Sequence, residues 1–177
     1  VLNEIKVFDV DGSFVDRWGS TGIDGEGLVG PSGIAIDNED NIYVVEQYGN
    51  RVRKLTSDGK PILKWGEEGE GEGQFDMPWG VALDSESNVY VADWRNDRVQ
   101  KFTSDGEFMA AFGESGEGEG QFKRPSSVAV DDDGLIYVAD WGNERVQVIG
   151  PDGIFHTMLY GESTISQWAK EWLEVNQ

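Results

Sequence analysis

The chain has 177 residues, no cysteine and a formal net charge of -20 at pH 7. The lack of thiols excludes a disulfide framework, a thiolate zinc site and a cysteine nucleophile. The negative charge argues against a nucleic-acid partner, because nucleic-acid affinity depends largely on Lys and Arg neutralising phosphates. No apolar run approaches the ~18 residues that a membrane span requires, so we expect no membrane insertion.

The first 19 residues predict a β-hairpin. Two strand-like runs, 4–10 and 13–18, flank Asp11-Gly12, and Asp-Gly readily takes the positive φ angles of a tight hairpin turn. These residues contain neither the basic segment nor the apolar run of a secretory leader. Because the chain starts within a repeating pattern, we expect a mature piece or a fragment whose compartment the sequence leaves open.

Three similar units follow, at 20–66, 67–113 and 114–160, with a period of 47 residues marked by Pro31, Pro78 and Pro125. Each unit predicts four short strands in the order a, b, c, d. The predicted ranges are 33–37, 42–45, 51–55 and 61–65 in the first unit; 80–84, 89–92, 98–102 and 107–112 in the second; and 127–131, 136–139, 145–149 and 154–160 in the third.

A repeated four-stranded antiparallel unit of this length is typical of a β-propeller blade. Residues 69–106 carry the pattern G-x-G-x-G-Q-F-x-x-P, V-A-x-D, N-x-Y-V-A-D, N-x-R-V-Q and D-G. This pattern resembles the NHL-repeat propeller family. The resemblance implies an all-β propeller segment over 1–162, with 1–19 as a half blade and three complete blades, strand a innermost.

The resemblance implies a ring of about six blades, whereas this chain offers three blades and two further strands. We therefore expect further blades, from the same longer chain or from another subunit.

Residues 163–177 break the repeat. Ile165, Trp168, Trp172 and Leu173 recur at helical spacing on one face, and Thr164 with Gln167 fits a capping box. We expect a short amphipathic α-helix that packs on a blade face or anchors the segment to its assembly.

Antiparallel order places the linker before strand a and the loop between strands b and c at the same end of each blade. Loops on a rigid scaffold often carry binding residues, and Trp and Arg dominate binding hot spots. The candidate ligand surface at this end consists of Tyr48, Trp79, Trp94, Arg95 and Trp141, with Glu46 and Gln47 nearby. Trp94 and Trp141 share one repeat position, which also fits a packing role, whereas Trp79 departs from its repeat partners Ser32 and Ser126.

Recurring charged residues predict structural contacts. Asp93 and Asp140 precede Arg98 and Arg145 by five residues, and Glu46 stands in the same relation to Arg51. We expect these pairs to fix the loops between them. Asp37, Asp84 and Asp131 end strand a in each unit and are expected to cap turns.

The sequence predicts a non-catalytic binding or scaffold segment with a protein or other extended partner, no catalytic residues and no cofactor. The acidic loops 67–73 and 114–120 suggest calcium but lack the ligand spacing of a dedicated calcium loop. The alternative is part of a propeller enzyme, since the resemblance would permit a metal-dependent lyase, lactonase or hydrolase. The only histidine, His156, lies on a predicted outer strand, so the remaining site residues of such an enzyme would lie outside this chain.

Overall fold

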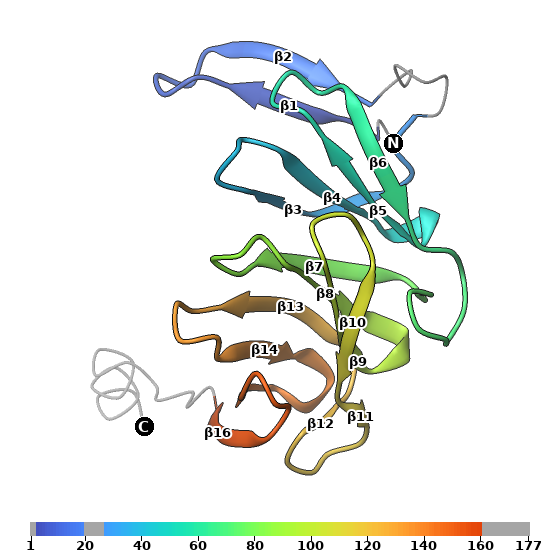
Figure 1. Cartoon of the computed structure of the whole chain (residues 1–177), viewed down its shortest axis with the longest axis vertical. Helices are drawn as coiled ribbons and strands as arrows, with labels where there is room; N and C mark the ends of the chain where they lie inside the picture. Colours follow the sequence, from blue (N-terminus) through green and yellow to red (C-terminus); the bar gives the residue numbers. More distant parts are fainter. Residues whose placement is uncertain (1–2, 20–26, 161–177) are drawn as a thin grey trace, which may run out of the picture.

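The computed structural model describes residues 3–19 and 27–160. The described residues form one N-terminal hairpin and three four-stranded antiparallel sheets, which follow one another along the long axis of the molecule (Figure 1). The hairpin pairs β1 (Ile5–Phe8) with β2 (Phe14–Trp18).

Each sheet uses four consecutive strands in chain order. The first sheet contains β3 (Pro31–Ile36), β4 (Ile42–Glu46), β5 (Arg51–Leu55) and β6 (Pro61–Trp65). The second contains β7 (Pro78–Leu83), β8 (Val89–Asp93), β9 (Arg98–Phe102) and β10 (Phe108–Phe112). The third contains β13 (Pro125–Val130), β14 (Ile136–Asp140), β15 (Arg145–Ile149) and β16 (Phe155–Tyr160).

Short helical turns and loops share one end of the sheets. The 3-10 helices η1 (Gln47–Gly49), η2 (Trp94–Asn96) and η3 (Trp141–Asn143) connect the second strand of each sheet to the third. Pairing of Pro78 with Asp93, and of Asp93 with Arg98, shows that the linker before each sheet reaches this same end. We call this end the top face. In the linker before the third sheet, β11 (Glu114–Ser115) pairs in parallel with β12 (Gln121–Phe122).

The first strand of the second sheet, β7, packs against the first strands of both neighbouring sheets, β3 and β13. Their approach is close at Gly80, where an added Cβ would lie 2.6 Å from Ser127 Cα. A larger residue at this point would push neighbouring sheets apart, so glycine is required by contact between backbones. Strand a is therefore innermost, as the sequence predicts.

The core lies between sheets. Phe122, from the linker before the third sheet, is fully buried beside Val99 and Phe112 of the second sheet and Val128 of the third. An added Cβ at Gly113 would lie 2.2 Å from the Phe122 ring, so this glycine makes room for the aromatic side chain. Phe75 takes the same position between the first and second sheets.

The strand predictions from sequence agree closely with the structure. The third strand of every sheet and β6 have the predicted bounds, and the remaining sheet strands differ by at most two residues at an end. The turn prediction is confirmed for the glycines, since Gly12, Gly59, Gly106 and Gly153 all have positive φ. It is wrong for the preceding aspartates, which do not appear among the positive-φ residues.

The predicted C-terminal helix lies outside the described residues. Within 3–19 and 27–160, no helix is long and apolar enough to span a membrane.

Candidate functional site

The five predicted surface residues all lie at the top face. Tyr48 belongs to η1, Trp94 and Arg95 to η2, and Trp141 to η3, whereas Trp79 is the second residue of β7. The structure brings Trp79, Trp94 and Arg95 together in the second sheet. Tyr48 and Trp141 occupy related loops in the first and third sheets.

Trp79 stacks on Trp94, with ring centroids 5.4 Å apart and an angle of 19° between the rings. The guanidinium carbons of Arg95 and Arg124 lie 5.9 and 5.0 Å from the centroid of Trp94. Both indole Nε1 atoms are buried and lack a hydrogen-bond partner among the described residues. The two rings are half-buried. The stack therefore exposes part of its apolar surface next to two guanidinium groups. We call Trp79, Trp94, Arg95 and Arg124 the tryptophan–arginine cluster.

Arg124 was not predicted from the sequence. It lies in the linker before β13, so the cluster joins the second sheet to the third. A signal for it was present: Arg124 stands where the preceding units have Gly30 and Met77. The same departure from repeat partners singled out Trp79.

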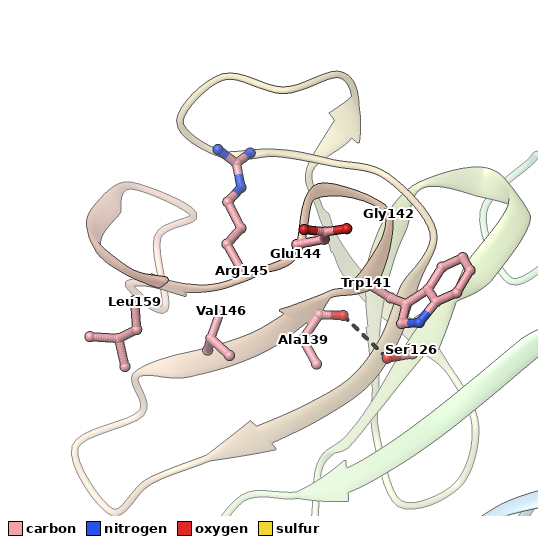
Figure 2. Close-up of a pocket in the computed structure, with 8 residues that line it drawn as sticks. All are labelled: Ser126, Ala139, Trp141, Gly142, Glu144, Arg145, Val146 and Leu159. Carbon is pink, nitrogen blue, oxygen red and sulfur yellow. Dashed lines mark hydrogen bonds between the residues drawn. The ribbon is translucent and has the colours of Figure 1, made fainter. Parts of the chain in front are cut away.

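The third sheet lacks such a cluster. Ser126 stands at the position of Trp79, and its hydroxyl donates to the Ala139 carbonyl at 3.5 Å (Figure 2). Trp141 remains 58% exposed beside a hollow of about 490 Å³. Leu159 lines the same hollow and is 55% exposed, whereas its repeat partner Phe112 is buried against the third sheet. This face of the third sheet is thus open among the described residues.

Tyr48 is 68% exposed. Its ring covers Gly30, where an added Cβ would lie 2.5 Å from the tyrosine Cδ2. It occupies the repeat position of Arg95 rather than that of Trp94 and Trp141.

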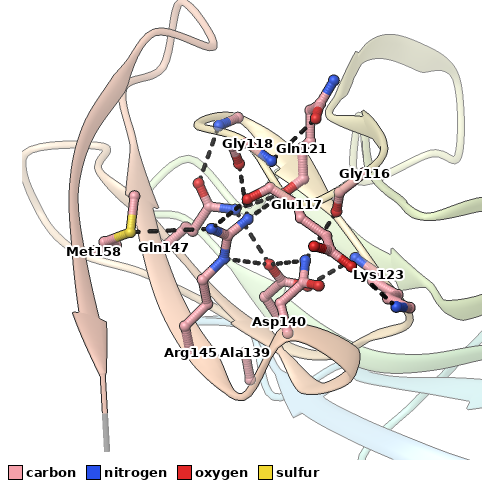
Figure 3. A network of polar contacts seen from close by, with 12 residues as sticks. Gly116, Glu117, Gly118, Gln121, Lys123, Ala139, Asp140, Arg145, Gln147 and Met158 are labelled. Carbon is pink, nitrogen blue, oxygen red and sulfur yellow. Dashed lines mark hydrogen bonds and ion pairs between the residues drawn. The ribbon is translucent and has the colours of Figure 1, made fainter.

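A buried carboxylate network lies beneath each of these loops. In the third sheet, Arg145 Nε donates to Asp140 Oδ2 at 2.8 Å, and Asp140 Oδ1 accepts the Lys123 backbone N–H at 2.7 Å (Figure 3). The guanidinium also donates to the backbone carbonyls of Glu117, Gly118 and Gln121. The network therefore ties the linker to the sheet.

The second sheet repeats this arrangement with Asp93, Arg98 and Gln100. Asp93 Oδ1 accepts the Asp76 backbone N–H at 2.9 Å. Burial raises the pKa of Asp93 above its ordinary value, and the hydrogen bonds and Arg98 only partly oppose this effect. The predicted structural role of the Asp–Arg pairs is confirmed by these contacts.

The first sheet varies the network. Glu46 is fully buried and contacts both Arg51 and Arg53, and its Oε1 accepts the Val29 backbone N–H at 2.7 Å. Arg53 accompanies the longer glutamate and stands where the other sheets have Gln100 and Gln147. In all three sheets, a buried carboxylate accepts a backbone N–H of the preceding linker.

The predicted turn caps are also present at the opposite end of the sheets. Asp84 Oδ1 accepts the backbone N–H groups of Glu86 and Asn88, and Oδ2 accepts the Tyr90 hydroxyl. Asp37 and Asp131 make the corresponding contacts. These carboxylates stabilise turns far from the top face.

The acidic linkers take their shape from the arginines. Arg98 donates to the carbonyls of Glu70, Gly71 and Gln74, as Arg145 does one repeat later. Among the described residues, no group of three or more His, Asp or Glu side chains is placed to hold a metal ion.

Comparisons with known proteins agree with this architecture. The NHL repeat model matches residues 75–102 and 122–149. No curated protein sequence matches the chain.

Solved structures show the same fold at low identity. A streptogramin B lyase is 15% identical, with a TM-score of 0.68 over 92% of this chain and 49% of its own. A catalytically inactive virginiamycin B lyase from Staphylococcus aureus with quinupristin is 19% identical, with a TM-score of 0.66 over 92% of this chain and 50% of its own. A protein of unknown function from Bacteroides caccae is 15% identical, with a TM-score of 0.64 over 93% of this chain and 57% of its own.

The chain thus spans about half the length of the lyases that it matches. At these identities the likeness concerns the fold. The resemblance deduced from the sequence pattern is confirmed: the NHL repeat model matches two segments of the chain, and the fold is all-β and propeller-like.

Proposed function

We propose that this chain is a non-catalytic binding segment of a β-propeller, and that its top face holds a protein partner. The three sheets serve as complete blades and the N-terminal hairpin as half of another. The exposed Leu159 face supports the presence of a further blade against the third sheet, because the equivalent face of the second sheet is buried by its neighbour.

The observation that carries the binding role is the tryptophan–arginine cluster. The repeat itself does not require Trp79, since Ser32 and Ser126 occupy the same position in complete sheets. Trp and Arg contribute most often to binding hot spots because they combine a large apolar area with a polar group. A half-buried Trp pair with two neighbouring arginines fits that role.

Trp79→Ser tests the proposal. Ser32 donates to the Val45 carbonyl and Ser126 to the Ala139 carbonyl, so the introduced hydroxyl has the equivalent carbonyl of Ala92 within reach and the sheet is expected to form. The affinity for a partner isolated with the wild-type chain should fall by about 1–2 kcal/mol, or roughly 5–30-fold.

Ile62→Ser is the matched control, because Ile62 is an exposed apolar residue of β6, away from the top face. It should leave the affinity measured by calorimetry unchanged. Equal affinity of the wild type and Trp79→Ser for that partner would contradict the proposal.

The likeness to two lyases supports a second candidate, in which the chain is part of a propeller enzyme whose other site residues lie elsewhere. Incubation with quinupristin, followed by mass spectrometry, separates the two candidates. Consumption above the buffer level, together with dependence on a stoichiometric metal, would contradict the non-catalytic proposal. An unchanged quinupristin signal is the result expected from the binding segment.

A further inference from the structure

Three cations that depart from the repeat surround one hollow at the top face. Arg95, Lys123 and Arg124 line a depression of about 570 Å³ between the second and third sheets. The residues one repeat earlier are Tyr48, Asp76 and Met77. The repeat scaffold thus forms the loops, while the positive charges are particular to this junction.

The backbone conformation at Arg124 is held by a hydrogen bond and is shared with the preceding unit. Its φ is 54°, and its N–H donates to Asp97 Oδ1 at 2.6 Å. Met77 has a φ of 53°, and its N–H donates to Asn50 Oδ1 at 2.8 Å. The conformation at this position is therefore shared, and only the side chain differs.

The guanidinium of Arg124 is available to a ligand. It lies over Trp94 and makes no ion pair or side-chain hydrogen bond among the described residues. The nearby carboxylate of Asp97 is engaged by the Arg124 backbone and by the Ser115 hydroxyl, which donates to Oδ2 at 2.6 Å.

The other two cations have exposed partners. Arg95 pairs with Asp76 at 3.5 Å, and Lys123 pairs with Glu117 at 3.4 Å. Exposed pairs of this kind contribute little stability and exchange readily with other charged groups. The lining of the depression thus contains as many carboxylates as cations, and the carboxylates belong to Asp76, Asp97 and Glu117. The chain as a whole has a net charge of -20.

This equal number of cations and carboxylates favours a ligand with a single negative charge, such as a carboxylate. A guanidinium binds a carboxylate through two parallel N–H donors. A doubly charged phosphate or a polyanion would be repelled more strongly by the surrounding acidic groups. Trp94, which contacts both guanidinium groups and stacks on Trp79, lies next to the lining residues and offers apolar contact to the group that carries the carboxylate.

We propose that the depression is a subsite for a single carboxylate of the protein partner, held by Arg124 with Arg95 beside it. The carboxylate belongs to an acidic side chain or a chain terminus next to an apolar residue. This assignment rests on the proposed binding function and specifies the chemistry of the segment that docks.

The test uses the full chain labelled with ¹⁵N and two small probes, N-acetylphenylalanine and its uncharged amide. Titration should shift the indole Nε1–H resonances of Trp79 and Trp94, with the carboxylate probe binding about tenfold more tightly than the amide, as expected for one charge-assisted interaction. Arg124→Met, which copies Met77, should reduce the affinity for the carboxylate probe to that for the amide.

Arg17→Met is the control, since it removes an exposed charge from β2 and should leave probe binding unchanged. Equal binding of acid and amide, an unaffected Arg124→Met variant, an equal loss in Arg17→Met, or tighter binding of inorganic phosphate than of the carboxylate would each overturn the subsite. If Trp79→Ser still weakens partner binding in that case, the proposed function stands without the subsite.

Discussion

The second and third sheets share nearly the same framework but carry different top surfaces. Both bury an Asp–Arg–Gln network that holds the preceding linker, through Asp93, Arg98 and Gln100 in one sheet and their repeat partners in the other. Above this network, the second sheet presents Trp79 stacked on Trp94, whereas the third presents Ser126 below an exposed Trp141.

The difference separates two roles for residues in a repeat. Positions that recur are accounted for by contacts that every sheet makes, above all the buried carboxylate that accepts a backbone N–H of the preceding linker. Positions that depart from the repeat, such as Trp79 and Arg124, are free to serve a ligand. Changes at recurring positions should therefore lower stability, and changes at departing positions should alter binding.

The largest effect is expected from Arg145→Ala. Asp140 is fully buried, and its arginine partner is 92% buried. Removing the guanidinium leaves a buried carboxylate without its cation and three linker carbonyls without their donor. The free energy of unfolding should fall by about 3–5 kcal/mol, measured by urea denaturation.

Arg95→Ala is the matched comparison, because it removes the same side chain from the top surface. Its exposed pair with Asp76 should contribute no more than ~1 kcal/mol. Equal losses in the two variants would contradict the division between framework and surface.

A smaller loss is expected from Phe122→Leu. Phe122 is fully buried between two sheets, and the first unit carries Leu28 at this position. The shorter side chain keeps the apolar contact but fills less volume beside Phe112. A decrease of about 1–1.5 kcal/mol in the free energy of unfolding is expected.

Ile154→Leu, at a residue that is 63% exposed, provides the baseline for the same measurement. A fall of less than about 0.3 kcal/mol in Phe122→Leu would show that the aromatic ring is not needed between these sheets.

Much of the framework could be predicted from the sequence, because a residue that makes the same structural contact in each sheet recurs at the same position of each unit. Three copies of the alternating apolar pattern fixed the strand bounds closely, and the constant spacing between Asp93 and Arg98 indicated their pairing. The recurring Asp84 position likewise indicated a turn cap, which its hydrogen bonds confirm.

The candidate surface was predicted less completely. Trp79 was singled out by its departure from the repeat. However, the contact of Arg124 with Trp94, the ring on which Trp79 stacks, joins a linker residue to the preceding sheet. Sequence spacing within one unit carries no information on which linker side chain reaches the next sheet. Comparing all three units position by position would have identified Arg124, since Gly30 and Met77 stand in its place.

The smallest predicted effect concerns the turn carboxylates and depends on pH. Burial raises the pKa of Asp84, but hydrogen bonds from Asn88 and the pair with Lys101 at 3.2 Å outweigh burial and hold the pKa below 3.8. The ionised carboxylate thus stabilises the folded chain above pH 3.8, and this contribution is lost as the pH falls through the lowered value. Asp84→Asn should cost about 1 kcal/mol at pH 7.

The equivalent turn of the third sheet, capped by Asp131, provides the comparison for the loss of stability in Asp84→Asn. Val148 stands in the third sheet where the second has Lys101, so Asp131→Asn removes a turn cap without removing an ion pair and should cost less at pH 7. Thermal unfolding of the wild type and both variants between pH 3 and 7 measures these differences. The gap between the wild type and Asp84→Asn should narrow below pH 3.8, because protonation removes the same charge that the substitution removes. A gap that widens in acid would show that the neutral carboxyl, rather than the carboxylate, stabilises this turn.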